Sequence, residues 1–255
     1  MCITLALAAA LASTSPIGRT LHYLRSNDDG SRPEHIYVHR AAADRLEVFK
    51  MVKRCTHAAL VLATVDPVTG EASRLEAAAL LPGAQRKTYG TIAFDPATGT
   101  LRMALEMNGK PAEATATATA RPWHLYDYDL ATLTVAFQAA QPERLDFGLA
   151  LVWIEPGTPV LRWLGAATAT RGAPTRLRGH DAWRYDVSGP AFGTAGGGPL
   201  WIDRRDGTLV EARWRRPNHQ GYRDFRLRLI GEEAPGAAGW TALLTRHHAG
   251  CLPAA

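Results

Sequence analysis

The sequence lacks the short motifs that identify several large classes of enzyme. It contains no Gly-x-Ser-x-Gly, no His-Glu-x-x-His, no Gly-x-x-x-x-Gly-Lys-Ser/Thr and no Gly-x-Gly-x-x-Gly. These motifs position a serine nucleophile, a zinc ion, a nucleotide phosphate or a dinucleotide. Their absence argues against the corresponding hydrolases, metalloproteases, nucleotide-hydrolysing enzymes and dehydrogenases. We therefore expect a protein that uses no cofactor.

The chain is also poor in lysine and in clustered charge. Only four of its 29 basic residues are lysines, and its 24 acidic residues are interleaved with the arginines, so that no run of five like charges occurs. Such mixing is typical of a solvated surface, whereas basic tails that bind nucleic acid carry blocks of one sign. We expect no nucleic-acid partner.

Long apolar runs are equally scarce. Residues 5–12 form an apolar stretch that ends in Ala10-Leu11-Ala12, although no Lys or Arg precedes Arg19. An apolar core before a small-x-small site is typical of a secretory signal. We therefore predict a signal peptide at residues 1–15 and a periplasmic or secreted protein. Later segments fall short of the roughly 18 apolar residues that a membrane helix needs, so we expect no transmembrane segment.

Cysteine is nearly absent, with three residues in the chain. Cys2 would leave with the signal peptide, so Cys55 and Cys251 remain as a pair that an oxidising compartment could join. The chain-entropy model assigns roughly 4–5 kcal/mol to a disulfide that closes about 200 residues. The alternative is two unpaired thiols.

A repeated turn is the clearest feature that the chain does contain. Asp-x-x-x-Gly follows an apolar residue at 66–70, 95–99 and 203–207. The aspartate can accept hydrogen bonds from the turn, and the glycine supplies the left-handed backbone that returns the chain. We predict three β-hairpins with four-residue loops.

The segments around these turns alternate between apolar and polar residues. Residues 101–107, 183–187 and 225–229 show this period of two, which indicates strands with one buried face. One stretch has helical spacing instead, and we predict a helix at about 128–140, with Asp127 or Asp129 as its N-terminal cap. We interpret His247-His248 as part of a polar C-terminal tail.

Together these patterns predict the fold. Residues 16–255 would form a single, mainly β domain: a curved antiparallel sheet or open barrel of about 10–12 strands, with one helix packed against it. No shift in composition marks a boundary between two domains.

The C-terminal part of the sequence resembles a known group of proteins. The stretches LWIDRRDGTLVEARW, at 200–214, and NHQGYRDFRLRL, at 218–229, are similar to the end of exported LolA-like bacterial carrier proteins and their relatives. The likeness covers roughly 35 of the 255 residues and consists of a Trp-x-Asp hairpin followed by an alternating strand. It implies a curved sheet with an apolar cavity that holds acyl chains.

Large aromatic side chains in the predicted strands are our candidates for contacting such a ligand. They could line an apolar cavity or fill the core, since rings of this size serve both purposes. The candidates are Trp163, Trp183, Trp201, Trp214 and Phe225.

Two histidines on one predicted strand suggest different chemistry. His35, Tyr37 and His39 share one face, where imidazoles two positions apart lie about 7 Å from each other. A metal could bridge His35 and His39 if a third ligand came from elsewhere. The alternative is a half-exposed polar strand face.

Our leading hypothesis is an exported, non-enzymatic binding or carrier protein for an apolar or amphipathic, lipid-like small molecule. One alternative is a hydrolase or metal-dependent enzyme that uses His35, Tyr37 or His39. Another is a cell-envelope interaction module that docks an unknown partner protein through a sheet edge or through an arginine face that includes Arg213 and Arg226.

Overall fold

The computed structural model describes residues 17–107, 109–155 and 158–251, so the predicted signal peptide lies outside the described residues. Fifteen strands form one sheet. They are β1 (Thr20–Ser26), β2 (Glu34–Ala42), β3 (Arg45–Met51), β4 (Ala58–Val65), β5 (Ala72–Leu81), β6 (Gln85–Asp95), β7 (Thr100–Met107), β8 (Lys110–Thr117), β9 (Trp123–Leu125), β10 (Arg144–Glu155), β11 (Thr158–Leu177), β12 (His180–Ser188), β13 (Gly198–Asp203), β14 (Leu209–Trp214) and β15 (Phe225–Glu232).

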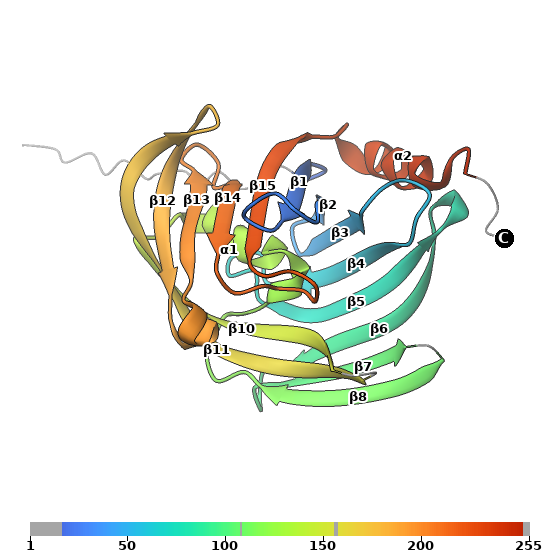
Figure 1. The fold of residues 1–255 in the computed structure, drawn as a ribbon, viewed down its shortest axis with the longest axis horizontal. Coiled ribbons are helices and arrows are strands. Elements are labelled where there is room, and N and C mark those ends of the chain that lie inside the picture. Colours follow the sequence, from blue (N-terminus) through green and yellow to red (C-terminus); the bar gives the residue numbers. More distant parts are fainter. Residues whose placement is uncertain (1–16, 108, 156–157, 252–255) are drawn as a thin grey trace, which may run out of the picture.

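The sheet is a long meander that curls around its own core (Figure 1). Its order is β8-β7-β6-β5-β4-β3-β2-β1-β15-β14-β13-β12-β11-β10-β9, and every neighbouring pair is antiparallel except β9 and β10. The edge strands β8 and β9 follow one another in the chain, and β8 contacts β11, yet the sheet remains open. The predicted curved, mainly antiparallel fold is therefore confirmed, with more strands than alternation alone identifies.

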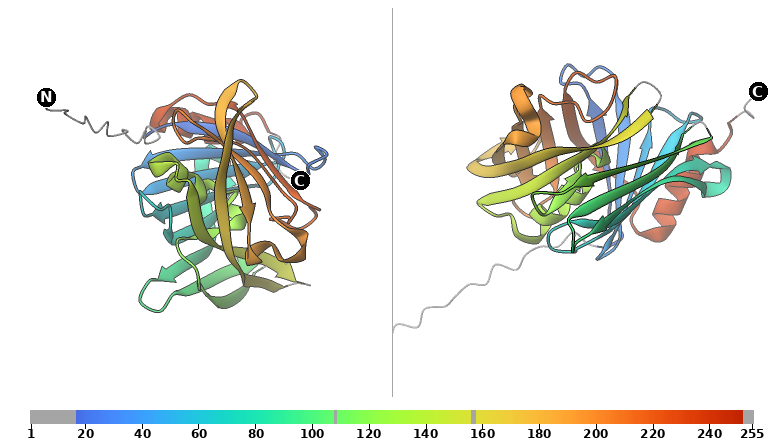
Figure 2. Two further views of the ribbon diagram at one scale, coloured as in Figure 1. Left: turned by 90° about the vertical axis from the view of Figure 1, so that its left-hand side faces the viewer. Right: turned by 90° about the horizontal axis from the view of Figure 1, so that it is seen from below.

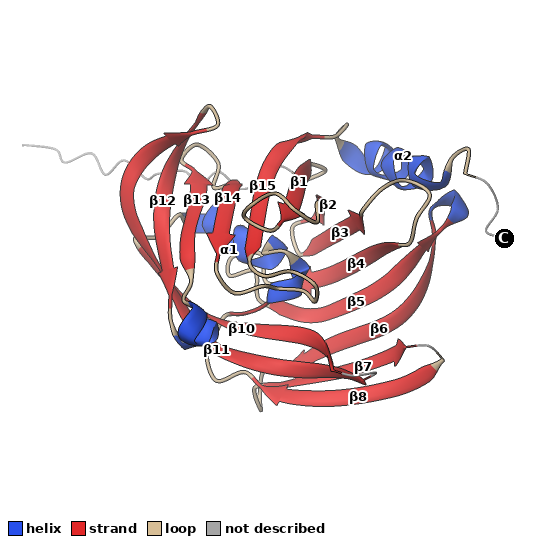
Figure 3. Cartoon of the chain, in the orientation of Figure 1, coloured by secondary structure: helices blue, strands red, loops and turns tan. Residues whose placement is uncertain are grey.

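Helix α1 (Ala131–Ala140) occupies the centre of this curve (Figures 1 and 3). All its residues from Ala131 to Gln138 are buried, because the sheet surrounds it. A helix enclosed on all sides needs no polar stripe, which explains why apolar residues and small threonines cover its whole circumference. The predicted helix at about 128–140 is thus present but begins three residues later.

Two of the three repeated turns hold this helix in place. A Cβ atom at Gly70 would lie 2.0 Å from the Thr132 carbonyl oxygen, and one at Gly207 would lie 2.4 Å from that of Phe137. Both glycines also have positive φ, 70° and 71°. Glycine is therefore required twice over at each position, for the turn itself and for the close approach of the helix backbone.

The C-terminal segment corrects one prediction. Residues interpreted as a polar tail form a second helix, α2 (Gly236–His248), which lies on the outer face of the sheet (Figures 1 and 2). Trp240, Leu243 and Leu244 pack there against Tyr37 and Phe49. Helical spacing turns the adjacent histidines to different environments, and His247 is buried. Part of the outer face of strands β2 to β5 is consequently covered as well.

Cys55 and Cys251 form the predicted disulfide, with their Cα atoms 5.5 Å apart. The bond joins the turn between β3 and β4 to the residue that follows the last turn of α2. Cys55 N–H also donates to the His247 carbonyl oxygen at 3.2 Å. None of the helices in the described part of the chain is long and apolar enough to cross a membrane.

Candidate functional site

The five aromatic candidates do not converge on one site. Trp214 and Phe225 are buried in the main core, where each ring centroid lies 5.3 Å from that of Tyr126. Trp183 is half-buried between the guanidinium groups of Arg171 and Arg204, each 4.6 Å from its ring centroid.

The other two tryptophans are also half-buried and engaged elsewhere. Trp163 donates a hydrogen bond to Thr119 Oγ1 at 2.9 Å and lies against Gly148, while the Arg213 guanidinium lies 5.7 Å from the Trp201 ring centroid. Core packing and cation–π contacts thus account for the positions of all five aromatic candidates.

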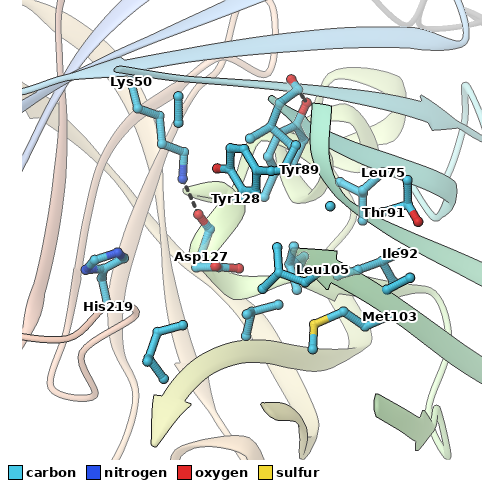
Figure 4. Close-up of a pocket in the computed structure, with 18 of the residues that line it drawn as sticks. Lys50, Leu75, Tyr89, Thr91, Ile92, Met103, Leu105, Asp127, Tyr128 and His219 are labelled. Carbon is cyan, nitrogen blue, oxygen red and sulfur yellow. Dashed lines mark hydrogen bonds between the residues drawn. The ribbon is translucent and has the colours of Figure 1, made fainter. Parts of the chain in front are cut away.

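A cavity of about 260 Å³ lies elsewhere, between the inner face of the sheet and η2 (Tyr126–Tyr128), the short 3-10 helix before α1 (Figure 4). Among the described residues that line it, none is one of the five aromatic candidates. Leu75, Ile92 and Met103 form an apolar side, and Lys50, Asp127 and His219 lie at the opposite side (Figure 4). The cavity is therefore amphipathic.

Small residues at matching register positions leave this space open. Ala77 of β5 pairs with Val61 of β4 on one side and with Gly90 of β6 on the other. Ala59, also on the lining, lies beside Lys50. Neighbouring positions on an antiparallel sheet normally meet through their side chains, so the small residues leave room in the wall, part of which the Leu105 side chain fills over Gly90.

A buried charge cluster closes the polar side. The carboxylate of Asp129 accepts hydrogen bonds from Arg25 Nη1 at 3.1 Å and Asn218 Nδ2 at 2.9 Å, and it lies 2.6 Å from Lys50 Nζ. Arg25 pairs with Glu34 as well. Burial raises the pKa of Asp129, but Arg25 and Lys50 outweigh it and hold the pKa below its usual value.

The backbone at this cluster is strained. Asp129 and Leu130 both have left-handed conformations, with φ of 52° and 60°. Leucine adopts this region at a cost, and such strain persists where surrounding contacts over-determine it, often at functional sites. The side chain of Asp129 bonds to Arg25, Lys50 and Asn218 instead of capping α1, which has no side-chain cap, so the predicted capping role is wrong.

Asp127 has the most unusual environment in the cavity. Its Oδ1 atom is buried and lacks a hydrogen-bond partner, although its main-chain oxygen accepts a hydrogen bond from Lys50. Figure 4 shows the carboxyl group pointing away from Lys50, toward Leu105. Burial raises the pKa of Asp127 to about 6, against the opposing effect of Lys50. Asp127 is not the predicted helix cap either, since no side chain caps α1.

His35, Tyr37 and His39 lie on the other face of the sheet. Tyr37 packs into the cluster under α2, and His39 stacks on Trp240 with ring centroids 4.9 Å apart. His35 Nδ1 lies 2.9 Å from His22 Nε2, whereas His39 Nδ1 lies 2.9 Å from Thr20 Oγ1. Across residues 17–107, 109–155 and 158–251, no group of three His, Cys, Asp or Glu side chains could hold a metal ion. A site at His35 and His39 stays a prediction.

This outer histidine cluster makes stability depend on pH. Burial, and then the neighbouring His35, lower the pKa of His22 to about 4, with Glu233 opposing. The unfolded chain therefore binds more protons than the native protein below the ordinary histidine pKa of about 6.5. Stability should fall by up to about 3 kcal/mol as the pH drops from about 6.5 to about 4. The test is urea unfolding across this range, comparing wild type with His22→Gln.

Glutamine at position 22 keeps a polar side chain but cannot titrate. Its curve of unfolding free energy against pH should be flatter than that of wild type. The exposed His57 provides the control, since His57→Gln should leave the curve unchanged. Parallel curves for wild type and His22→Gln would contradict the assignment.

The sequence matches no protein-family model, and no curated protein is significantly similar to it. The geometry of the cavity therefore carries the functional conclusion.

Proposed function

We propose that the chain is an exported, non-enzymatic binding or carrier protein for an apolar or amphipathic, lipid-like molecule. The observation that carries this proposal is the cavity of about 260 Å³, with its apolar side and its charged side. An engineered cavity of about 150 Å³ already binds benzene, so this volume is sufficient for a larger apolar group. Ligand sites typically combine an apolar wall with a few polar groups that orient the ligand.

Two further features support this function. The disulfide between Cys55 and Cys251 is compatible with export to an oxidising compartment. A curved sheet around an apolar cavity is also what the resemblance of residues 200–229 to LolA-like carriers implies.

Filling the cavity tests the proposal. Ala77→Phe places a ring into the cavity, so it should weaken binding of the neutral fluorescent dye 1-aminonaphthalene, which has ten carbon atoms, at least about tenfold, because the ring and the dye compete for the same buried volume. Fluorescence titration measures this binding. Ala77→Leu is a milder variant and should have an intermediate effect.

Ala97→Phe is the matched control, because Ala97 is exposed in the turn between β6 and β7. It adds the same ring outside the cavity and should leave the affinity for the dye unchanged. Binding that fails to saturate, or that Ala77→Phe leaves intact, would refute the proposed function.

A further inference from the structure

We propose that the ligand of this cavity is a single-chain amphiphile with a positively charged head group, and that the carboxylate of Asp127 receives that head group. The inference rests on the proposed function and names the class of ligand. It begins from Asp127 Oδ1, a buried carboxylate oxygen on the cavity lining that has no hydrogen-bond partner. A buried acceptor without a partner is costly, and a donor on the ligand would remove that cost.

The charges around Asp127 favour a cation over a neutral donor. Arg25 and Lys50 are balanced by Glu34 and Asp129, which they contact directly. The Lys50 ammonium group meets Asp129 and the main-chain oxygen of Asp127, and the Asp127 carboxyl group points away from it (Figure 4). An ionised Asp127 therefore leaves the polar side with one uncompensated negative charge. Charge-assisted hydrogen bonds are the strong ones, so an ammonium group is the complementary partner.

A carboxylate head group, as in a fatty acid, is the opposite case. Its approach would add a second uncompensated negative charge to that of Asp127 in a site of low dielectric constant. The cations that could offset this charge already contact carboxylates. We expect fatty acids to be rejected.

The volume sets the length of the chain. By proportion with the cavity of about 150 Å³ that holds the six carbons of benzene, about 260 Å³ accommodates about ten carbon atoms. The apolar side formed by Leu75, Ile92 and Met103 would contact these carbons. A ten-carbon chain is therefore the appropriate probe.

The pH dependence of binding gives an independent signature. The titratable and charged groups near Asp127 are Asp129, whose charge raises the pKa of Asp127, and the lining residues Arg25, Glu34, Lys50, Tyr89, Tyr128 and His219. Burial lowers the pKa of His219 and raises those of both tyrosines, so it disfavours the charged form of all three. With its pKa of about 6, Asp127 loses its charge as the pH falls through that value. Affinity for a cation should then decline, while affinity for an alcohol of equal length should stay constant.

Displacement of 1-aminonaphthalene by decylammonium, 1-decanol and decanoate tests the inference at about pH 8 and about pH 5. At the higher pH, decylammonium should bind at least about tenfold more tightly than the other two, the scale of a charge-assisted hydrogen bond. Asp127→Asn should remove this preference and its pH dependence, so that decylammonium binds no more tightly than 1-decanol. An unchanged far-ultraviolet circular-dichroism spectrum and urea midpoint show that the variant is folded.

Asp146→Asn is the charge-matched control, since Asp146 is exposed on β10, and it should preserve the preference for decylammonium. The inference would be overturned if decanoate bound as tightly as decylammonium, or if the preference for decylammonium survived Asp127→Asn. Either result would leave the carrier function intact. Loss of saturable dye binding in the wild-type protein would instead overturn the carrier function itself.

Discussion

Asp129→Asn should lower the free energy of unfolding by about 3 kcal/mol, because it leaves two buried cations without their shared counter-charge. Lys50 would retain only the main-chain oxygen of Asp127, and Arg25 would retain Glu34. Asparagine suits the test because it has the shape of aspartate and also tolerates the left-handed conformation found at position 129. Backbone strain is therefore nearly unchanged, and the measured loss reports the charge.

Urea unfolding of the purified variant gives this free energy. The control is the ion pair of Arg144 with Asp146, whose side chains are both exposed. Asp146→Asn should cost at most about 1 kcal/mol, because exposed pairs contribute little. If Asp129→Asn and Asp146→Asn lowered the free energy of unfolding equally, the buried charge cluster around Asp129 would not stabilise the polar side of the cavity.

Sequence patterns could predict the outline of this fold because the controlling signals are local. Alternation in 101–107 and 225–229 depends on neighbours two residues apart, and the Asp-x-x-x-Gly turns are complete within five residues. These signals place strands and hairpins, and the structure confirms them. The three-residue strand β9 has no such pattern, since its pairing with β10 is fixed by tertiary contacts.

Helix α2 is not evident from the sequence, because its helical spacing of buried residues is opposed by glycines and by the lack of an N-terminal cap. Trp240, Leu243 and His247 recur at helical spacing, which predicts a buried stripe. Glycines at 236 and 239 disfavour a helix, and no side chain caps its start. Packing on the outer face of the sheet outweighs this weak propensity, and no pattern within the segment reveals that such a face is available.

The sequence contains a signal for the charged side of the cavity, namely charged residues that continue the buried face of a strand. Arg25 continues the buried stripe of Leu21 and Tyr23, and Lys50 continues that of Leu46 and Val48. A charged residue at the end of an apolar strand face must find a buried partner or a site that needs it. That rule could have selected Arg25 and Lys50 without the structure.

The cavity itself could not be predicted from local pattern. It requires Ala77 to face Val61 and Gly90 across two hairpins, and each pairing follows a shift in register, between Thr64 and Val65 and between Ala77 and Ala78. A shift by one residue moves a side chain to the opposite face. The size of a tryptophan ring likewise does not reveal which face of the sheet the residue occupies.

Removing the disulfide should have the other large effect on stability. Cys55→Ser with Cys251→Ser opens a loop closed over a sequence separation of 196 residues. The chain-entropy model predicts a loss of about 5 kcal/mol, since the unfolded chain gains freedom. Wild type with reductant should have the same urea unfolding curve as the double variant without reductant. Both should have a larger m-value than the oxidised wild type, because their unfolded states expose more surface. A loss below about 1 kcal/mol would contradict this mechanism.

The disulfide could instead act in the native state by holding α2 against the sheet. Trp240→Ala separates the two mechanisms, because it removes the buried ring between α2 and His39 and should cost about 3–5 kcal/mol by itself. If the disulfide acts on the unfolded chain, the losses from Trp240→Ala and from the two serine substitutions should add in the triple variant. If it acts by holding α2, the triple variant should lose less than the sum, since a helix already released has no packing left to lose.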